Sequence, residues 1–259
     1  MDLGIAGCTA IVCASSRGLG PACAAALAAA GCRVVVNGRN RAALERTRTE
    51  IAAATGTEII AVAADLSSEE GRAALMEAAP EPDILVNNNG GPPPRDWRDV
   101  GHDEMLAGLE ANMIAPALLI RAVIDGMAER RFGRIVNVTS GSVKAPIAGL
   151  ELSSGARAGL TGYVAGIARS VAHANVTINN LLPGAFDTDR IAALVENQAR
   201  QSGEAAEAVR RRREQAIPAR RFGDSAEFGA ACAFMCSAQA GYITGQSLLI
   251  DGGAFPGIM

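Results

Sequence analysis

Short apolar runs rich in β-branched residues alternate with longer helical stretches along the whole chain. The strand-like runs occupy residues 9–14, 33–37, 58–63, 83–87, 134–138, 176–182 and 247–250. Runs of this kind are typical of strands that are buried on both faces of a sheet. The longest helical stretches between them lie at residues 104–130 and 155–173. Because alternating strands and helices form right-handed βαβ units, the pattern predicts an α/β fold with a parallel sheet covered by helices on both faces.

The length of 259 residues suits one large domain that can bury a substantial core. No linker, low-complexity tract or internal repeat interrupts the sequence, so we expect a single domain over residues 1–259. Residues 186–218 are the least strand-like part and carry a charged helical pattern. We expect this segment to be an insertion that lies over the carboxyl edge of the sheet as a substrate lid.

Composition and charge narrow the classes of partner. The formal net charge of −3 gives no reason to expect a nucleic acid. No uncharged apolar run reaches the length of about 18 residues that a membrane span needs, and the N-terminus lacks the basic leader of a signal peptide. We therefore expect a cytoplasmic protein with no membrane partner. Cys232 and Cys236 have no nearby His or second Cys pair to complete a zinc site, so we expect no bound metal.

A glycine-containing turn follows the first strand-like run and reads Ala14-Ser15-Ser16-Arg17-Gly18-Leu19-Gly20. Such a turn lets the backbone approach a pyrophosphate, and the helix after it presents free N–H groups to the phosphates. Ala14 stands where a turn of this kind has its first glycine. Its methyl group disfavours a positive φ, although an unstrained turn accepts alanine. The alternative interpretation is a turn that binds no ligand.

Further polar or glycine-containing segments follow other strand-like runs. They are Asp65-Leu66 after the third run, Asn87-Asn88-Asn89-Gly90 after the fourth, and Pro183-Gly184 with Thr188 after the sixth. The carboxyl ends of parallel strands meet at one edge of the sheet, where open α/β sheets bind their ligands. Together with the turn at residues 14–20, these motifs resemble nearly end to end the short-chain dehydrogenase/reductase family, and most nearly its 3-oxoacyl-carrier-protein reductase branch.

The resemblance implies a single-domain, doubly wound Rossmann-type sheet of about seven strands that binds a dinucleotide. It places the cofactor on Ala14, Ser16, Arg17, Gly18, Leu19, Gly20, Arg39, Asp65, Leu66, Asn88, Asn89, Gly90, Arg157, Pro183, Gly184 and Thr188. It also implies a homotetramer, because residues 221–223 and 250–253 match the closing segments that help to build tetramers in this family.

The charges near the second strand-like run indicate which dinucleotide binds. An acidic residue at the end of this strand would accept hydrogen bonds from a ribose 2′-hydroxyl and would repel a 2′-phosphate. This chain has Gly38-Arg39 there, and Arg17 adds a second guanidinium in the glycine turn. Because two guanidinium groups suit a phosphate dianion, we predict NADP(H) rather than NAD(H).

The resemblance places Asn112 and Ser140 at two catalytic positions of the family. The asparagine holds a water in the proton relay, and the serine hydrogen-bonds the substrate oxygen; the alternative for Ser140 is a hydroxyl that satisfies local backbone groups. The family's tyrosine and lysine, which lie four residues apart on one helix face, are replaced by Ser153 and Arg157. A serine hydroxyl is far less acidic than a phenol, and a guanidinium does not give up its proton in proteins. We expect Arg157 to hydrogen-bond the cofactor ribose, and Ser153 to relay a proton only through another group.

Lys144 is the one lysine among the 24 basic Lys and Arg residues. It follows Ser140 by four residues, in the loop where the substrate pocket of the family opens. Partial desolvation beside Arg157 would lower the pKa of this amine and let it act as a general acid. We hypothesise that Lys144 with Ser140 replaces the missing tyrosine; the alternative is an exposed loop lysine. Structural roles are expected for Tyr163, Tyr242, His102 and His173.

Three functions follow from these residues. The first is an NADP(H)-dependent oxidoreductase that interconverts a small-molecule ketone and a secondary alcohol by hydride transfer, with a non-standard proton donor. The second is a nucleotide-binding sensor or structural protein without redox turnover, which the missing tyrosine and lysine favour. The third is a non-redox lyase or isomerase in the same cleft.

Overall fold

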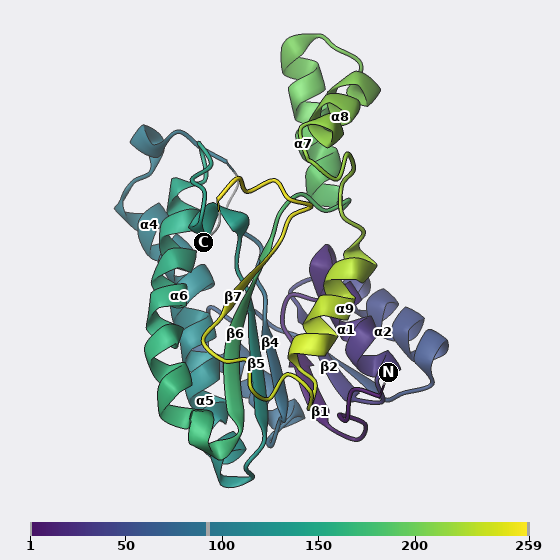
Figure 1. Ribbon diagram of the computed structural model, residues 1–259, viewed down its shortest axis with the longest axis vertical. Helices are drawn as coiled ribbons and strands as arrows, with labels where there is room; N and C mark the ends of the chain where they lie inside the picture. Colours follow the sequence, from purple (N-terminus) through teal and green to yellow (C-terminus); the bar gives the residue numbers. More distant parts are fainter. Residues whose placement is uncertain (1, 92–93, 258–259) are drawn as a thin grey trace.

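A parallel sheet of seven strands forms the centre of the computed structural model, which describes residues 2–91 and 94–257 (Figure 1). The strands are β1 (Thr9–Val12), β2 (Arg33–Gly38), β3 (Ile59–Ala63), β4 (Ile84–Asn87), β5 (Gly133–Val138), β6 (Val176–Pro183) and β7 (Ser247–Ile250). Their order across the sheet is β3-β2-β1-β4-β5-β6-β7, and each neighbouring pair is parallel. The predicted fold class is confirmed, and every predicted strand-like run forms a strand.

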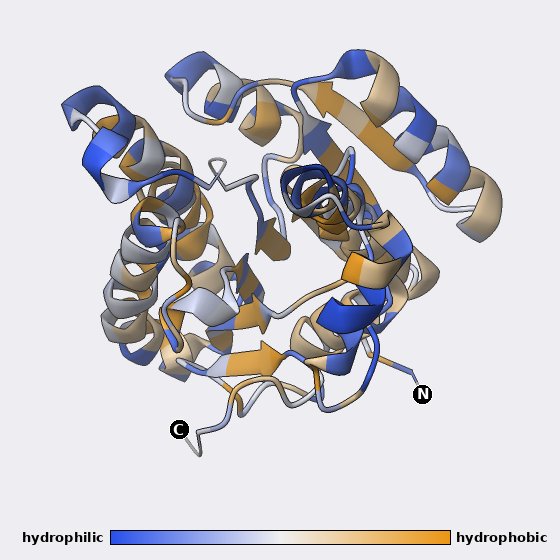
Figure 2. Cartoon of the chain, turned by 90° about the horizontal axis from the view of Figure 1, so that it is seen from above, coloured by the Kyte–Doolittle hydropathy of each residue, from blue (hydrophilic) through white to orange (hydrophobic). Residues whose placement is uncertain are grey.

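Helices cover both faces of the sheet, as predicted for a doubly wound fold. One face carries α1 (Leu19–Ala29), α2 (Arg41–Thr55) and α9 (Ser225–Met235), whose buried Leu27 and Phe228 belong to one hydrophobic cluster. The other face carries α3 (Glu69–Ala78), α5 (Ala115–Glu129) and α6 (Glu151–Val171), with Leu75 and Leu160 in a second cluster. Figure 2 shows hydrophobic strands between helices whose outer turns are hydrophilic. Apolar burial on both faces is the main stabilising term of such a sheet.

The predicted helix over residues 104–130 is wrong in one respect, because the structure divides it. Helix α4 (His102–Leu109) passes into a π-helical turn at Glu110–Ile114, and α5 begins at Ala115. Pro116 explains the break, since it has no N–H to donate to the carbonyl of Asn112 and its ring crowds that carbonyl in a regular helix. π turns inside α-helices are frequent at functional sites.

The same stretch, His102–Glu129, is long and apolar enough to cross a membrane by length and composition alone. In the fold the α5 part of this stretch packs in the core, whereas most of α4 is exposed. Helix α5 buries Leu119, Ile120 and Val123 in the second hydrophobic cluster, on the face of the sheet that α3, α5 and α6 cover. A buried helix of this kind needs no lipid to cover its apolar face.

Residues 186–218 contain α7 (Asp189–Ser202) and α8 (Ala206–Gln215), which form a helical hairpin projecting beyond the carboxyl edge of the sheet (Figure 1). The hairpin has a small apolar cluster of its own, formed by Val195, Ala199 and Val209. The charged helical pattern of this segment thus forms helices, and its status as an insertion stays a prediction. Its role as a substrate lid stays a prediction.

The strand order reverses between β1 and β4, which are neighbours in the sheet although β2 and β3 separate them in sequence. Open α/β sheets bind ligands outside the carboxyl ends of their strands at such a reversal. The segments after Val12 and Asn87 both leave the sheet at this point. The topology thus brings the glycine turn and the asparagine segment together.

Candidate active site

The backbone of the glycine turn is strained at its first residue. Ala14 has φ +45°, in the left-handed region that favours glycine, so the expectation of an unstrained turn is wrong. Gly20 packs so closely that an added Cβ would lie 2.4 Å from the Ala14 carbonyl oxygen. Only glycine fits there.

The start of α1 is open to an anion. Gly18 precedes the helix with φ +69° and, having no side chain, makes no capping hydrogen bond. A Cβ on Gly18 would meet no atom within 4 Å, so space remains in front of the first helical N–H groups. Free N–H groups and the helix dipole favour a phosphate at this place. Gly18, Leu19 and Gly20 thus fit the pyrophosphate of a dinucleotide.

Buried amides and hydroxyls fix the turn against its neighbours. Asn37 at the end of β2 accepts a hydrogen bond from the backbone N–H of Ala14 (3.4 Å), and Ser15 Oγ donates to the carbonyl of Val12 (2.8 Å). From the segment after β4, Asn88 Nδ2 donates to the carbonyl of Ala14 (3.2 Å). These bonds hold the turn at the sheet edge before any ligand arrives.

The two arginines expected to bind a 2′-phosphate are exposed beside this turn. Arg17 and Arg39 are both solvent-exposed, and Arg39 Nη1 lies 3.7 Å from the carboxylate of Asp65. An exposed ion pair of this length contributes about 0–1 kcal/mol. A phosphate dianion can therefore displace Asp65 from Arg39 at little cost. Leu66, the next residue, is partly buried against the second hydrophobic cluster.

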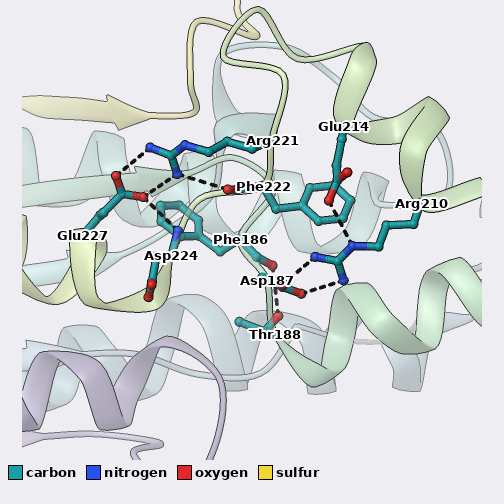
Figure 3. Close-up of polar contacts among 9 residues, drawn as sticks. All are labelled: Phe186, Asp187, Thr188, Arg210, Glu214, Arg221, Phe222, Asp224 and Glu227. Carbon is teal, nitrogen blue, oxygen red and sulfur yellow. Dashed lines mark hydrogen bonds and ion pairs between the residues drawn. The ribbon is translucent and has the colours of Figure 1, made fainter. Parts of the chain in front are cut away.

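The loop after β6 and the base of the α7–α8 hairpin are tied by ion pairs (Figure 3). Arg210 donates to both carboxylate oxygens of Asp187 (3.1 and 2.5 Å), and Arg221 donates to both of Glu227 (2.7 Å each). Hydrogen bonding from Arg210 lowers the pKa of Asp187. Thr188 follows Asp187 and is the N-cap residue of α7.

Of the remaining two residues expected in that loop, Pro183 ends β6 and Gly184 follows it at the sheet edge. The backbone N–H of Gly184 donates to the Ile250 carbonyl (2.8 Å), and a Cβ on Gly184 would lie 2.6 Å from that of Asp251. The C-terminal segment therefore packs tightly against the start of this loop.

Asn112 lies in the π turn and is 3% exposed. Its Nδ2 donates to the carbonyl of Gly108 (3.3 Å), whereas its Oδ1 has no hydrogen-bond partner among the described residues. A buried unsatisfied acceptor costs about 1–3 kcal/mol and marks a place for a ligand or a water. Asn89, which also follows β4, fixes the turn by donating to the carbonyl of Ala111 (2.8 Å).

Arg157 is buried (7% exposed) and binds backbone rather than open space. Its Nη1 donates to the carbonyls of Val138 (2.7 Å) and Thr139 (2.9 Å), and its Nη2 donates to the carbonyl of Asn89 (2.9 Å). The guanidinium thus joins the end of β5 to the segment after β4. Burial, and secondarily the charge of Arg190, lower the pKa of Arg157 to about 10, so the group stays a cation at neutral pH.

Ser153 precedes Arg157 by one helical turn on α6 and is also buried. Its Oγ accepts a hydrogen bond from Arg157 Nε (3.2 Å). Ser153 and Asn112 line a cavity of about 380 Å³ together with Gly90 and Gly91. Two of the predicted catalytic residues therefore face the same space as the segment after β4.

Ser140 lies two residues after β5 and belongs to a chain of hydroxyl groups. Ser142 Oγ donates to Ser140 Oγ (2.9 Å), and Ser154 Oγ donates to Ser142 Oγ (2.9 Å). Ser142 is buried and Ser154 is half-buried, so the chain leads from the end of β5 toward the surface. In this arrangement the O–H of Ser140 remains available for another acceptor. Neither Ser142 nor Ser154 was identified from the sequence.

Lys144 is exposed at the end of a short 3₁₀ turn. Its amine makes no hydrogen bond or ion pair with any residue in the described ranges, and it does not line the cavity. The expected desolvation beside Arg157 is therefore not found. The other titratable candidates are all exposed: Tyr163, Tyr242, His102 and His173.

Comparisons with known proteins agree with this geometry. Residues 13–254 match a family model described as enoyl-(acyl carrier protein) reductase. The chain is 31% identical over 255 residues to the NADPH-dependent reductase BacG of Bacillus subtilis, covering 96% of this chain and 98% of that protein. It is 32% identical over 257 residues to the 3-oxoacyl-[acyl-carrier-protein] reductase FabG of Vibrio cholerae, covering 98% and 99%.

Solved structures show the same likeness over the whole fold. The L-sorbose reductase of Gluconobacter frateurii, solved in complex with NADPH and L-sorbose, superposes with a TM-score of 0.95 at 25% identity, with all of both chains covered. YwfH, an NADPH-dependent reductase involved in bacilysin biosynthesis, superposes with a TM-score of 0.91 at 30% identity, covering 98% of this chain and all of that one. The chain therefore belongs to the short-chain dehydrogenase/reductase family.

Proposed function

We propose that the protein is an NADP(H)-dependent oxidoreductase that interconverts a ketone and a secondary alcohol. The observation that carries this proposal is the open helix start at Gly18 together with a cavity that Arg39, Asn112 and Ser153 line. A dinucleotide whose pyrophosphate binds at Gly18 has its other end free to reach along the sheet edge. The NADPH-dependent relatives support the same cofactor.

The choice of NADP(H) over NAD(H) rests on charge. Arg17 and Arg39 are exposed beside the glycine turn, and the end of β2 carries Gly38 rather than an acidic residue. Guanidinium groups bind a phosphate dianion through paired, charge-assisted hydrogen bonds. When NADP(H) binds, its 2′-phosphate would replace the Asp65 carboxylate as the partner of Arg39. The phosphate dianion attracts the guanidinium more strongly than the carboxylate does.

The bound cofactor supplies the hydride; the residues of this chain hold the substrate oxygen and move its proton. Ser140 has an O–H that can donate to this oxygen. When the oxygen takes the proton of Ser140, Ser142 passes its own proton to Ser140, and Ser154 passes one to Ser142. Ser154 then recovers a proton from solvent. This hydroxyl chain supplies the proton that a phenol supplies elsewhere in the family.

Arg157 contributes charge and position rather than a proton in this scheme. Its buried cation stabilises negative charge that develops on the substrate oxygen, and its bond to Ser153 orients that hydroxyl. Lys144 remains a candidate for the donor. It ranks second because a loop movement would be needed to bring its amine to Ser140.

We infer a cytoplasmic homotetramer from the family, and the exposed Phe234, Tyr242 and Leu248 offer an apolar contact surface.

A comparison of NADPH and NADH consumption at 340 nm against a panel of ketones tests the proposal. We expect oxidation of NADPH, slower oxidation of NADH, and a loss of that preference in an Arg39→Ala variant. An Arg41→Ala variant, which changes a nearby exposed arginine in α2, is the control. Tight NADPH binding without oxidation by any ketone would instead favour the non-redox or sensor functions, for which the absence of a phenol at position 153 is the supporting observation.

A further inference from the structure

Three polar groups converge on one point beside Gly91. A Cβ placed on Gly91 would lie 3.1 Å from Ser153 Oγ, 3.2 Å from Arg190 Nη1 and 3.7 Å from Arg157 Nη2. Gly91 follows β4, Ser153 and Arg157 lie on α6, and Arg190 lies in the first turn of α7. Gly91 and Ser153 both line the cavity of about 380 Å³. The sequence motifs singled out neither Gly91 nor Arg190.

These groups have hydrogen-bond donors to spare. Arg157 uses four of the five N–H groups of a guanidinium, on Ser153 Oγ and three carbonyls, which leaves one N–H on Nη2. Ser153 Oγ accepts from Arg157, and its own O–H has no acceptor within the described ranges. Arg190 is exposed and forms no ion pair with a described carboxylate. The three side-chain atoms nearest to this point can therefore all donate a hydrogen bond to a ligand.

The same point carries an excess of positive charge. The charge of Arg190 adds to burial in lowering the pKa of Arg157. The two carboxylates that line the cavity are engaged elsewhere: Glu104 binds Arg95 and the N–H of Gly101, and Glu151 accepts from the N–H of Gly149. Two guanidinium groups that approach one another without a counter-ion repel, and an anion between them removes that repulsion.

We infer that the position beside Gly91 binds the carboxylate of the substrate, so that the substrate is a keto acid rather than a neutral ketone or an acyl thioester. This inference rests on the proposed function and names its substrate class. The hydride adds to the carbonyl carbon, the carbonyl oxygen takes a proton from Ser140, and the carboxylate stays unchanged. The products are a hydroxy acid and the oxidised cofactor. Charge-assisted hydrogen bonds from guanidinium groups give this recognition its strength.

Gly91 is suited to such a site because no side chain stands between its backbone and these donors. Its φ is not positive, so alanine at 91 would impose no strain on φ, but the added methyl group would lie 3.1 Å from Ser153 Oγ and 3.2 Å from Arg190 Nη1 and would block a carboxylate from reaching both donors. Arg190→Gln removes charge and keeps much of the side-chain length. Arg200→Gln is the matched control, because Arg200 is an exposed arginine on the same helix, α7.

The experiment compares matched acids and esters: pyruvate with methyl pyruvate, and acetoacetate with ethyl acetoacetate. We measure kcat/KM with NADPH and, independently of turnover, calorimetric binding of each acid to the complex with NADP⁺. Loss of a charge-assisted hydrogen bond corresponds to a factor of about 10–100. We expect one acid to be preferred over its ester by at least about tenfold, and Arg190→Gln and Gly91→Ala to remove that preference, while Arg200→Gln keeps it.

The outcomes separate this inference from the proposed function. Equal kcat/KM for acids and esters would overturn the carboxylate site and leave the reductase intact. Binding of an acid that depends on Arg190, without reduction of any ketone, would support the site and refute the reductase. If Arg190→Gln weakens NADPH binding by the same factor as acid binding, the donors serve the cofactor and the carboxylate site is wrong.

Discussion

At position 157 this chain has an arginine where the family has a lysine, and the arginine makes different contacts. The resemblance to the family suggested a cation for the cofactor ribose, but the guanidinium is engaged with the carbonyls of Val138, Thr139 and Asn89. The guanidinium of arginine is planar and carries more N–H donors than an ammonium group, so it can bind all three carbonyls at once, which a lysine at position 157 would do less well. The cation therefore holds the ends of two strands together, and one N–H is left for a ligand.

The absence of a phenol predicts an unusual dependence of rate on pH. Serine hydroxyls do not titrate near neutrality, and Arg157, with a pKa lowered to about 10 by burial, is protonated throughout that range. We therefore expect kcat/KM for ketone reduction to be constant between about pH 6 and pH 9. Activity that falls as the pH rises through this range would reveal a titrating acid, and disappearance of that step in Lys144→Ala would assign it to Lys144.

Ala14 is strained in a way that a single substitution relieves. A left-handed φ costs an L-residue about 1–2 kcal/mol, whereas glycine adds about 0.5–1 kcal/mol of unfolded-state entropy. We expect Ala14→Gly to raise the free energy of unfolding by about 0.5–1 kcal/mol, measured by urea denaturation. Ala26→Gly, inside α1, is the control and should lower it by about 1 kcal/mol. A destabilised Ala14→Gly protein would contradict the left-handed conformation at residue 14.

Much of the nucleotide end was predictable from the sequence because it is local. A strand, a glycine turn and a helix start define the position of Gly18 and Gly20 without reference to distant parts of the chain. Ser142, Ser154 and Arg190 were not predictable in this way. Their roles depend on how a 3₁₀ turn and the first turn of α7 are placed against α6, and no spacing in the sequence encodes that placement.

At the level of elements, the strands and most helices follow from hydrophobic pattern alone, but the division of the helix around Asn112 does not. The helical pattern continues through Glu110–Ile114, where apolar residues are mixed with Glu110 and Asn112, so periodicity indicates one helix. Pro116 is the only local signal, and proline is also tolerated in the first turn of a new helix. Only the structure, with its π turn, explains why the Asn112 side chain is buried and why its Oδ1 has no hydrogen-bond partner among the described residues.

The α7–α8 hairpin is fixed at its base by the pair between Asp187 and Arg210, and Arg210 also stacks on the ring of Phe222. We expect Arg210→Ala to loosen the hairpin and raise KM several-fold with a smaller change in kcat, while Arg211→Ala, at an exposed neighbouring position, leaves both unchanged. The lowered pKa of Asp187 keeps the pair intact at neutral pH, and the pair is lost only as the pH falls through that lowered pKa. An unchanged KM would show that the hairpin does not govern substrate binding.

The molecule as a whole combines the fold of a dinucleotide-binding protein with a catalytic end for which we propose a rebuilt proton path. The sheet, its reversal between β1 and β4 and the open start of α1 are those of a dinucleotide-binding fold. The catalytic end instead gathers serine hydroxyls and guanidinium groups. Family membership alone would suggest a tyrosine-dependent mechanism, which the residues at 153 and 157 do not allow.

The most direct test of this account is the rate of NADPH oxidation at 340 nm, with saturating keto acid, in the wild type and in Ser142→Ala. Ser142→Ala breaks the hydroxyl chain between Ser140 and Ser154 but removes no group that contacts the cofactor turn. General acid catalysis contributes a factor of about 10²–10⁴, so we expect turnover by the wild type and a loss of about 10² or more in kcat, with NADPH binding unchanged. Equal kcat in the two proteins would contradict the hydroxyl chain as the proton source.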